Sequence, residues 1–251
     1  MNDTENQTAL LDFGEPSQEK SMFHLIALGD RAALMLNHLR ADFGDWFIEG
    51  LPPYEVGDKP ARALIVLADE SSSIELLLAV YSDEDFIKHY LFVLDISPNP
   101  QPEKWPDACS YIWFSPTRQY ATVKHFFQMY YHDSFQIRSL ICFDFSDWRW
   151  MVQGKRRVVI HKFAVNDDLS QHLLQTPLSE VPKTRAFVIQ AIPFEMVEDN
   201  DFGSMINTNL FARLDDIDFK WTIVGQAPSL QEAYIALMEF IPLSNPVGNT
   251  L

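Results

Sequence analysis

Two carboxylates stand three residues apart in the segment CFDFSD, at Asp144 and Asp147, immediately before the apolar run WRWMV. Such a pair can orient a water molecule or bind a hard cation. Ser146 or Asp147 could instead cap a helix that begins there, because side-chain oxygens at such positions accept the first free amide groups. On the physics of the segment alone, capping is the simpler interpretation.

A phosphate site would be expected where a strand turns into a helix, and Gly29 stands at such a turn. The apolar run FHLIAL comes before it, and apolar residues recur at helical spacing after it. Glycines let backbone amides approach phosphate, but LGDRAAL fits neither a GxGxxG nor a GxxxxGK[ST] pattern. Asp30 adds a negative charge, so a plain turn is predicted.

The second such turn is ADESSSIE, which follows the apolar run ALIVLA and contains no glycine. Its amides and hydroxyls could hold an anion in principle, but Asp69 and Glu70 oppose one. Asp69 and the serines can cap a helix that starts near Ile74, which explains them without a ligand.

Other chemistry has little support in the residue pattern. The seven histidines form no HExxH, HxH or Cys-His spacing, and the two cysteines, Cys109 and Cys142, are too few for a zinc site or a disulfide framework. No GxSxG elbow is present. We therefore predict no metal and no cofactor, and the cysteine usage is typical of a reducing, cytoplasmic compartment.

The net charge of −16 disfavours nucleic acid and anionic membranes as general partners. Lys155, Arg156 and Arg157 form the one dense basic cluster, and the neighbouring VVI indicates the solvated start of a strand. The longest apolar runs are far shorter than the roughly 20 residues of a membrane span. Residues 1–20 lack the basic start and apolar core of a secretory signal, and we interpret them as a mobile tail.

Strands and helices alternate in the first half of the chain, which predicts a parallel sheet covered on both faces. Residues 118–140 contain no proline or glycine and repeat apolar residues at helical spacing, which predicts one long helix. KRRVVIHKFAV, TRAFVIQAI and FKWTIVGQA then read as strands, with helices in LSQHLLQ and FGSMINTNLFARL. SLQEAYIALMEFI is compatible with a helix or a buried strand.

The segment SLICFDFSDWRWMV resembles the loop after the central helix of FtsZ, where the family reads close to LINVDFADVRTVM. It lies at the end of the predicted long helix, as the family's loop does. DACSYIWFSP resembles the family strand VDTLIVIPN, and DDIDFKWTIVGQAPSLQEAYIALMEF resembles DPDANIIFGAVIDESLGDEVRVTVIATGF, which favours a final strand. The resemblance covers about residues 23–240 and is firmest after Ser110.

The resemblance implies an α/β, tubulin/FtsZ-like fold with a parallel, Rossmann-like N-terminal sheet, a long central helix and a smaller C-terminal α/β domain with a mixed sheet. The expected organisation is a mobile tail at 1–20, a degenerate nucleotide-binding-like domain at 21–117, the central helix at 118–140, the C-terminal domain at 141–242 and a tail at 243–251.

The departures from the family concern GTP. FtsZ and tubulin wrap its phosphates with a glycine-rich first loop and a GGGTGTG signature, and here Gly29 and ADESSSIE stand in their places. The family also reads guanine with an acidic or amide side chain on the central helix, where TVKHFF offers Thr122 and Lys124. Fixed negative charge in place of amides should weaken GTP binding by several kcal/mol. A pseudo-GTPase is predicted.

One part of the family's active machinery is retained. The loop that CFDFSD resembles completes the nucleotide site of the next subunit, where its two acids help to polarise the attacking water. Asp144 and Asp147 fall on those acids, while Cys142 replaces the leading asparagine. The same residues also start the following helix, so their retention has a structural explanation as well.

Three functional hypotheses follow. The first is a non-enzymatic protein that assembles with itself or docks on an FtsZ-type subunit, presenting its acidic loop to a partner's nucleotide face. The second is a divergent GTP hydrolase with altered phosphate loops, helped by the serines at 71–73. The third is a small-molecule binding module in the crevice between the two domains.

Overall fold

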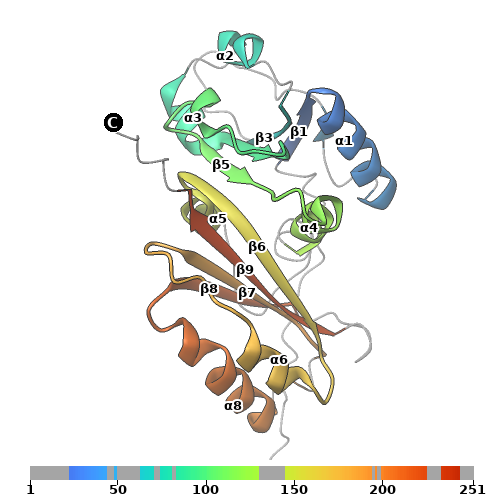
Figure 1. The fold of residues 1–251 in the computed structure, drawn as a ribbon, viewed down its shortest axis with the longest axis vertical. Helices are drawn as coiled ribbons and strands as arrows, with labels where there is room; N and C mark the ends of the chain where they lie inside the picture. Colours follow the sequence, from blue (N-terminus) through green and yellow to red (C-terminus); the bar gives the residue numbers. More distant parts are fainter. Residues whose placement is uncertain are drawn as a thin grey trace, which may run out of the picture.

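The computed structural model describes residues 23–43, 48–49, 63–70, 74–80, 83–129, 145–193, 196, 199–224 and 233–243. Its strands form a nine-stranded sheet in the order β2-β1-β3-β4-β5-β6-β9-β7-β8 (Figure 1). The strands are β1 Phe23–Leu28, β2 Ile48–Glu49, β3 Ala63–Ala68, β4 Leu91–Asp95, β5 Ser110–Trp113, β6 Lys155–Ala164, β7 Arg185–Ala191, β8 Asp218–Val224 and β9 Tyr234–Pro242. The α-helices are α1 Asp30–Phe43, α2 Glu75–Val80, α3 Glu84–Tyr90, α4 Gln119–Phe126, α5 Phe145–Val152, α6 Leu169–Gln175 and α8 Asn200–Asn209, with short 3₁₀ turns η2 Pro102–Lys104 and η4 Phe211–Leu214.

The N-terminal half is a parallel sheet buried on both faces, as the continuous apolar runs predict. Strands β1 to β5 pair in parallel, and every residue of β3 and β4 is buried. Alternate residues of these strands pack against α1, α4 and α5 on one face and against α2, α3 and Trp105 on the other.

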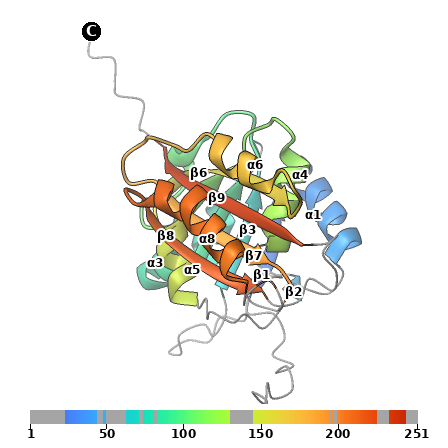
Figure 2. The same ribbon diagram turned by 90° about the horizontal axis from the view of Figure 1, so that it is seen from below.

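The C-terminal half continues the same sheet with mixed strand directions. β6 pairs in parallel with β5 over three residues and then runs antiparallel to β9, which is antiparallel to β7 in turn. Helices α6 and α8 cover one face of this part (Figure 2). On the other face, Phe126 of α4 contacts both Trp148 of α5 and Phe240 of β9, with ring centroids 6.0 and 6.4 Å apart. The two halves therefore share one hydrophobic core.

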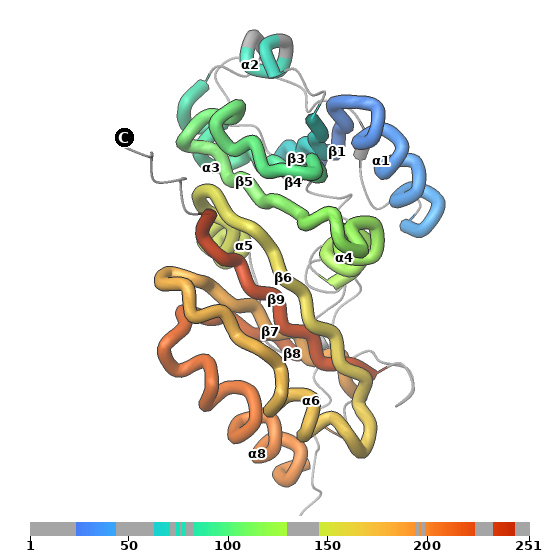
Figure 3. Tube along the Cα trace, viewed as in Figure 1, coloured from blue at the N-terminus to red at the C-terminus, as the bar shows by residue number. Residues whose placement is uncertain are grey.

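The chain path in Figure 3 shows how the predicted elements are arranged, with β6 lying where the two halves meet. The ambiguous segment SLQEAYIALMEFI contains a strand, β9, which is buried along nearly its whole length between β6 and β7. The predicted central helix is seen as α4 and one wider helical turn at 127–129, and residues 130–140 lie outside the described part. The predicted tail at 1–20 lies outside it too. Of the predicted tail at 243–251 only Leu243 is described, and its amide donates to the Lys155 carbonyl at 2.9 Å.

The basic cluster at the start of β6 is not solvated as predicted. The Lys155 Nζ donates to the carbonyls of Pro102, Trp105 and Pro106 at 2.9, 2.8 and 3.0 Å. Arg156 is 6% exposed and also donates to backbone carbonyls, and only Arg157 of the three points to solvent. The prediction of a strand start is correct, but two of the three charges serve to join loops to the sheet.

Candidate functional site

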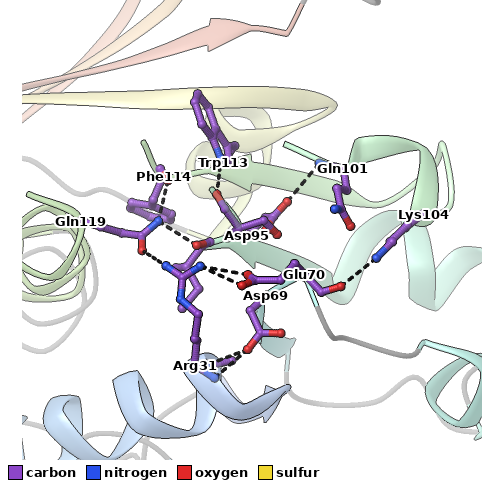
Figure 4. Close-up of polar contacts among 12 residues, drawn as sticks. Arg31, Asp69, Glu70, Asp95, Gln101, Lys104, Trp113, Phe114 and Gln119 are labelled. Carbon is purple, nitrogen blue, oxygen red and sulfur yellow. Dashed lines mark hydrogen bonds and ion pairs between the residues drawn. The ribbon is translucent and has the colours of Figure 1, made fainter. Parts of the chain in front are cut away.

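The candidate site lies at the carboxyl ends of β1, β3, β4 and β5, which meet at one edge of the sheet because the strands are parallel. Open α/β sheets bind their ligands at this edge, next to the helix that follows the first strand. In this chain polar side chains converge there from four different connections (Figure 4). The question for function is whether these groups are available to a ligand.

Asp69 occupies the N-terminus of α1. Its Oδ2 accepts hydrogen bonds from the backbone amides of Arg31 and Ala32 at 2.8 and 3.0 Å, and the residue is 3% exposed. The first amide groups of a helix have no acceptor within the helix, and they favour a negative charge beside them. The predicted cap on the helix near Ile74 stays a prediction, because residues 71–73 lie outside the described part. The Asp69 side chain crosses to the first helix and supplies the anion there.

Gly29 permits this contact. Its φ of +100° is unfavourable for other residues, and a Cβ at this position would lie 2.0 Å from Asp69 Oδ1. The predicted turn therefore requires a glycine at this position. The backbone lies close to a carboxylate there, in the way that glycines in phosphate-binding loops let the backbone come close to phosphate.

Arg31 links the same helix start to its neighbours. Its guanidinium donates to both carboxylate oxygens of Glu70, at 3.1 and 2.9 Å, and to Gln119 Oε1 at 3.2 Å. The Gln119 amide in turn donates to the carbonyls of Ile96 and Phe114 at 2.9 and 2.8 Å. One network thus ties α1, the end of β3, the ends of β4 and β5, and the start of α4.

Asp95, at the end of β4, is buried and also fully engaged within the chain. It accepts hydrogen bonds from the amides of Ser97 and Gln101 at 2.7 and 3.3 Å, and from the hydroxyls of Ser97 and Tyr111. Burial, with the neighbouring Asp95 charge, raises the pKa of Tyr111 well above its usual value, so this phenol remains a donor. Trp113 Nε1 donates to the Ser97 carbonyl at 3.0 Å and fixes the turn.

Thr122 and Lys124 on α4, which the resemblance compares with the family's guanine-reading region, also make internal contacts. Thr122 Oγ1 donates to the Arg118 carbonyl at 3.2 Å, and Lys124 Nζ lies 2.9 Å from Asp42 Oδ2 on α1. The Tyr120 hydroxyl donates to the same Asp42 carboxylate, which raises the pKa of Tyr120 to about 12. Hydrogen bonds from Tyr120 and then Lys124 lower the pKa of Asp42.

The two acids of the candidate co-catalytic loop are not seen together. Asp147 lies in the first turn of α5, with a side chain 23% exposed, and its Oδ1 is 2.8 Å from Lys220 Nζ of β8. Asp144 lies outside the described residues. A role for either acid on a partner subunit stays a prediction, and the ion pair gives Asp147 a contact within its own chain.

Sequence reasoning missed Arg31, Gln119 and Asp95, which complete the network. Asp95 ends an apolar run that is followed by a proline-rich linker, a signal that could have marked it as a strand-end carboxylate. Nothing in the residue pattern distinguishes Arg31 or Gln119 from ordinary helix-surface residues. Within the described ranges, no three His, Cys, Asp or Glu residues gather in an arrangement that could hold a metal ion, and no helix there is long and apolar enough to cross a membrane.

Comparison with known proteins gives similarity of fold. No family model matches the chain, and no curated protein is similar to it in sequence. Among solved structures, the GDP-form protofilaments of Bacillus thuringiensis serovar israelensis TubZ match at 13% identity over 86% of this chain and 69% of that one, with a TM-score of 0.49.

Two further matches belong to the same fold class. CetZ1 from Haloferax volcanii, a GDP-bound monomer, matches at 11% identity over 73% of this chain and 65% of that one, with a TM-score of 0.44. The empty FtsZ dimer of M. jannaschii matches at 12% identity over 84% and 68%, with a TM-score of 0.31. All three are tubulin/FtsZ-like proteins, the fold class that the sequence predicts.

Proposed function

We propose that this chain is a tubulin/FtsZ-like protein that acts through protein–protein contacts, by assembling with itself or by modulating FtsZ-type filaments, and that it does not turn over GTP. The observation that carries the proposal is the Asp69 carboxylate on the amides of Arg31 and Ala32. The anion-binding donors at the start of α1 already hold an anion, and it is covalently part of the chain.

The electrostatics of this arrangement oppose phosphate. A phosphate at α1 must either displace Asp69 or lie beside it, and two unit charges about 4 Å apart repel by about 4 kcal/mol at an effective dielectric constant of 20. That energy weakens binding by about a thousandfold. Glu70, which is 43% exposed and pairs with Arg31, adds a second carboxylate and occupies the nearest guanidinium.

The sequence supports the same conclusion. The family's phosphate loops depend on glycines, and the segment that stands in place of the GGGTGTG signature contains none and adds Asp69 and Glu70. Gly29 remains, but in the structure the space that its missing side chain leaves is used by Asp69. What is retained of the first loop therefore serves an internal contact.

Sedimentation of the purified full chain tests the function directly. It is pelleted alone, with GTP and Mg²⁺, and with an FtsZ-type protein, each at micromolar concentration. We expect one of two results. Either the chain pellets by itself, to the same extent with and without GTP, or it changes the pelleted fraction of the FtsZ-type protein. GTP-dependent assembly of the chain alone, or a chain that stays monomeric and inert in every mixture, would contradict the proposal.

The acidic loop provides a finer hypothesis, in which Asp144 and Asp147 meet a partner's nucleotide face. Asp147→Ala and Lys220→Ala form a matched pair, because both remove the ion pair but only the first removes the carboxylate. Weaker pelleting with Asp147→Ala and unchanged pelleting with Lys220→Ala would support contact with a partner. Equal effects of the two changes would show that Asp147 is a structural residue.

A further inference from the structure

A groove of about 280 Å³ lies between α1 and the start of α4, and it shares Arg31 and Gln119 with the polar network. Its described lining consists of Arg31, Leu34, Met35, His38, Ile96, Gln119 and Tyr120. Four of these residues lie on one stripe of α1, at positions i, i+3, i+4 and i+7. The groove is therefore a feature of the helix surface, with the end of β4 as its floor.

The groove exposes apolar surface that the fold does not use. Leu34, on its rim, is 59% exposed and is the most exposed large hydrophobic residue in the described part of the chain, and Tyr120 opposite it is 38% exposed. Its volume is slightly below the 300 Å³ or more of typical small-molecule pockets. Its size and form suit one or two apolar side chains of a peptide segment.

One basic side chain beside the groove differs from the others near it. Arg31 pairs with Glu70, and Lys124 pairs with Asp42, which also accepts from the Tyr120 hydroxyl. Arg118, immediately before Gln119, is exposed, and its guanidinium has no ion-pair partner among the described residues. In a chain with a net charge of −16, this surface favours a segment that combines apolar anchors with carboxylates.

The chain carries such a segment near its start. Residues 8–15 read TALLDFGE, with Leu10, Leu11 and Phe13 beside Asp12 and Glu15, and residues 1–20 contain five carboxylates and one lysine. Ten residues separate Phe13 from the start of β1 at Phe23 and can span up to about 33 Å. The six residues of β1 extend about 20 Å toward the groove, so the segment can reach it.

We propose that the α1–α4 groove binds the Leu10–Phe13 segment of the same chain. The apolar side chains would cover Leu34 and Tyr120, and the carboxylates would face Arg118. The segment would thereby cover the face of α1 next to the polar network. This inference does not depend on the proposed function, because it concerns a surface that the Asp69 contacts leave open.

Binding of a fluorescein-labelled peptide of residues 6–17 to the full chain, followed by anisotropy, tests the proposal. The host is the Leu11→Glu/Phe13→Glu chain, in which the chain's own segment cannot compete. We expect saturable binding that weakens at least tenfold when Leu34→Glu is added and severalfold with Arg118→Glu. Leu174→Glu on α6, where Leu174 is 51% exposed, is the matched control and should leave binding unchanged.

The wild-type chain supplies the second readout. Its own segment should compete as an intramolecular ligand at millimolar effective concentration, so its apparent affinity for the peptide should be at least tenfold weaker than that of the host. No binding up to 1 mM peptide, or no effect of Leu34→Glu, would overturn the groove assignment. Equal binding by wild type and host would overturn occupation by the same chain and assign the groove to a second copy or another partner.

Discussion

Two buried junctions of the sheet hold charge in opposite ways. At the carboxyl ends of β3 and β4, buried carboxylates accept hydrogen bonds from backbone amides, as Asp69 and Asp95 do. At the start of β6, Arg156 instead donates to the carbonyls of Gln153, Lys183 and Phe240 at 2.8, 3.0 and 2.8 Å. Amides collect where a helix begins after a strand, and carbonyls collect where loops meet strand ends.

The difference indicates which of the two junctions could hold an anion. A phosphate needs free amides, and the start of α1 presents amides to Asp69, whereas the start of β6 presents carbonyls to Arg156. The contacts of Arg156 connect strands and loops in the C-terminal half, as ordinary structural contacts do. Removing each buried charge in turn distinguishes the contributions of the two junctions to stability.

Arg156→Met should have the largest effect, a loss of about 2–4 kcal/mol in the free energy of unfolding. The change leaves buried carbonyls without a donor, each at a cost of about 1–3 kcal/mol, although it also relieves the desolvation that lowers the pKa of Arg156 to about 10. Urea unfolding of wild type, Arg156→Met and the exposed control Arg157→Met measures it. An Arg156→Met protein as stable as the control would show that the contacts of Arg156 contribute nothing to the free energy of unfolding.

Gly29→Ala should cost about 2–3 kcal/mol, because it adds a strained φ and displaces the Asp69 carboxylate from the amides of α1. The steric part requires Asp69, so in an Asp69→Ala background the same change should cost only about 1 kcal/mol. The double-mutant cycle in urea gives this difference. Additive effects would mean that the two residues are not in contact.

Asp69→Ala alone should cost about 1–2 kcal/mol, the usual loss for a helix cap, and Asp69→Asn should cost less because an amide oxygen still accepts from Arg31 and Ala32. Both proteins are compared by urea unfolding, with Asp83→Ala as control, since Asp83 is the local cap of the short helix α3 and also accepts from two consecutive amides, those of Asp85 and Phe86. An Asp69→Ala protein of unchanged stability would indicate that this carboxylate is not the cap of α1.

Tyr120→Phe should have the smallest effect, and it should depend on pH. The folded-state pKa of Asp42 is lowered by Tyr120 and Lys124, so this contribution is present above the unfolded pKa of about 3.9 and is lost as the pH falls through the folded value. The difference in urea midpoint between wild type and Tyr120→Phe should therefore be seen at pH 7 and vanish in strong acid. A difference that does not change with pH would point to packing instead.

The fold could be predicted from sequence because its strands are short apolar runs and its helices have clear periodicity. The segment of β9 is ambiguous by pattern, and only the resemblance to the last segment of FtsZ favours a strand there. The site was only half predictable. The loss of glycines is visible in ADESSSIE, but the contact of Asp69 with α1 joins residues 38 and 37 positions apart, and no local pattern reports such a pairing.

The predicted solvation of Lys155 and Arg156 failed for a related reason. A basic run beside an apolar strand usually lies in water, and the carbonyls that these side chains reach come from segments distant in sequence, such as Pro102 and Phe240. Long side chains can bury their charge wherever tertiary structure brings enough acceptors together.

The most direct test of the central claim is titration of the purified full chain with fluorescent GTP and GDP in Mg²⁺, alongside a turnover assay. The account predicts no binding at micromolar nucleotide and no phosphate release, because Asp69 holds the amides of Arg31 and Ala32. Micromolar binding with hydrolysis would contradict it and would make the altered loops a working phosphate site.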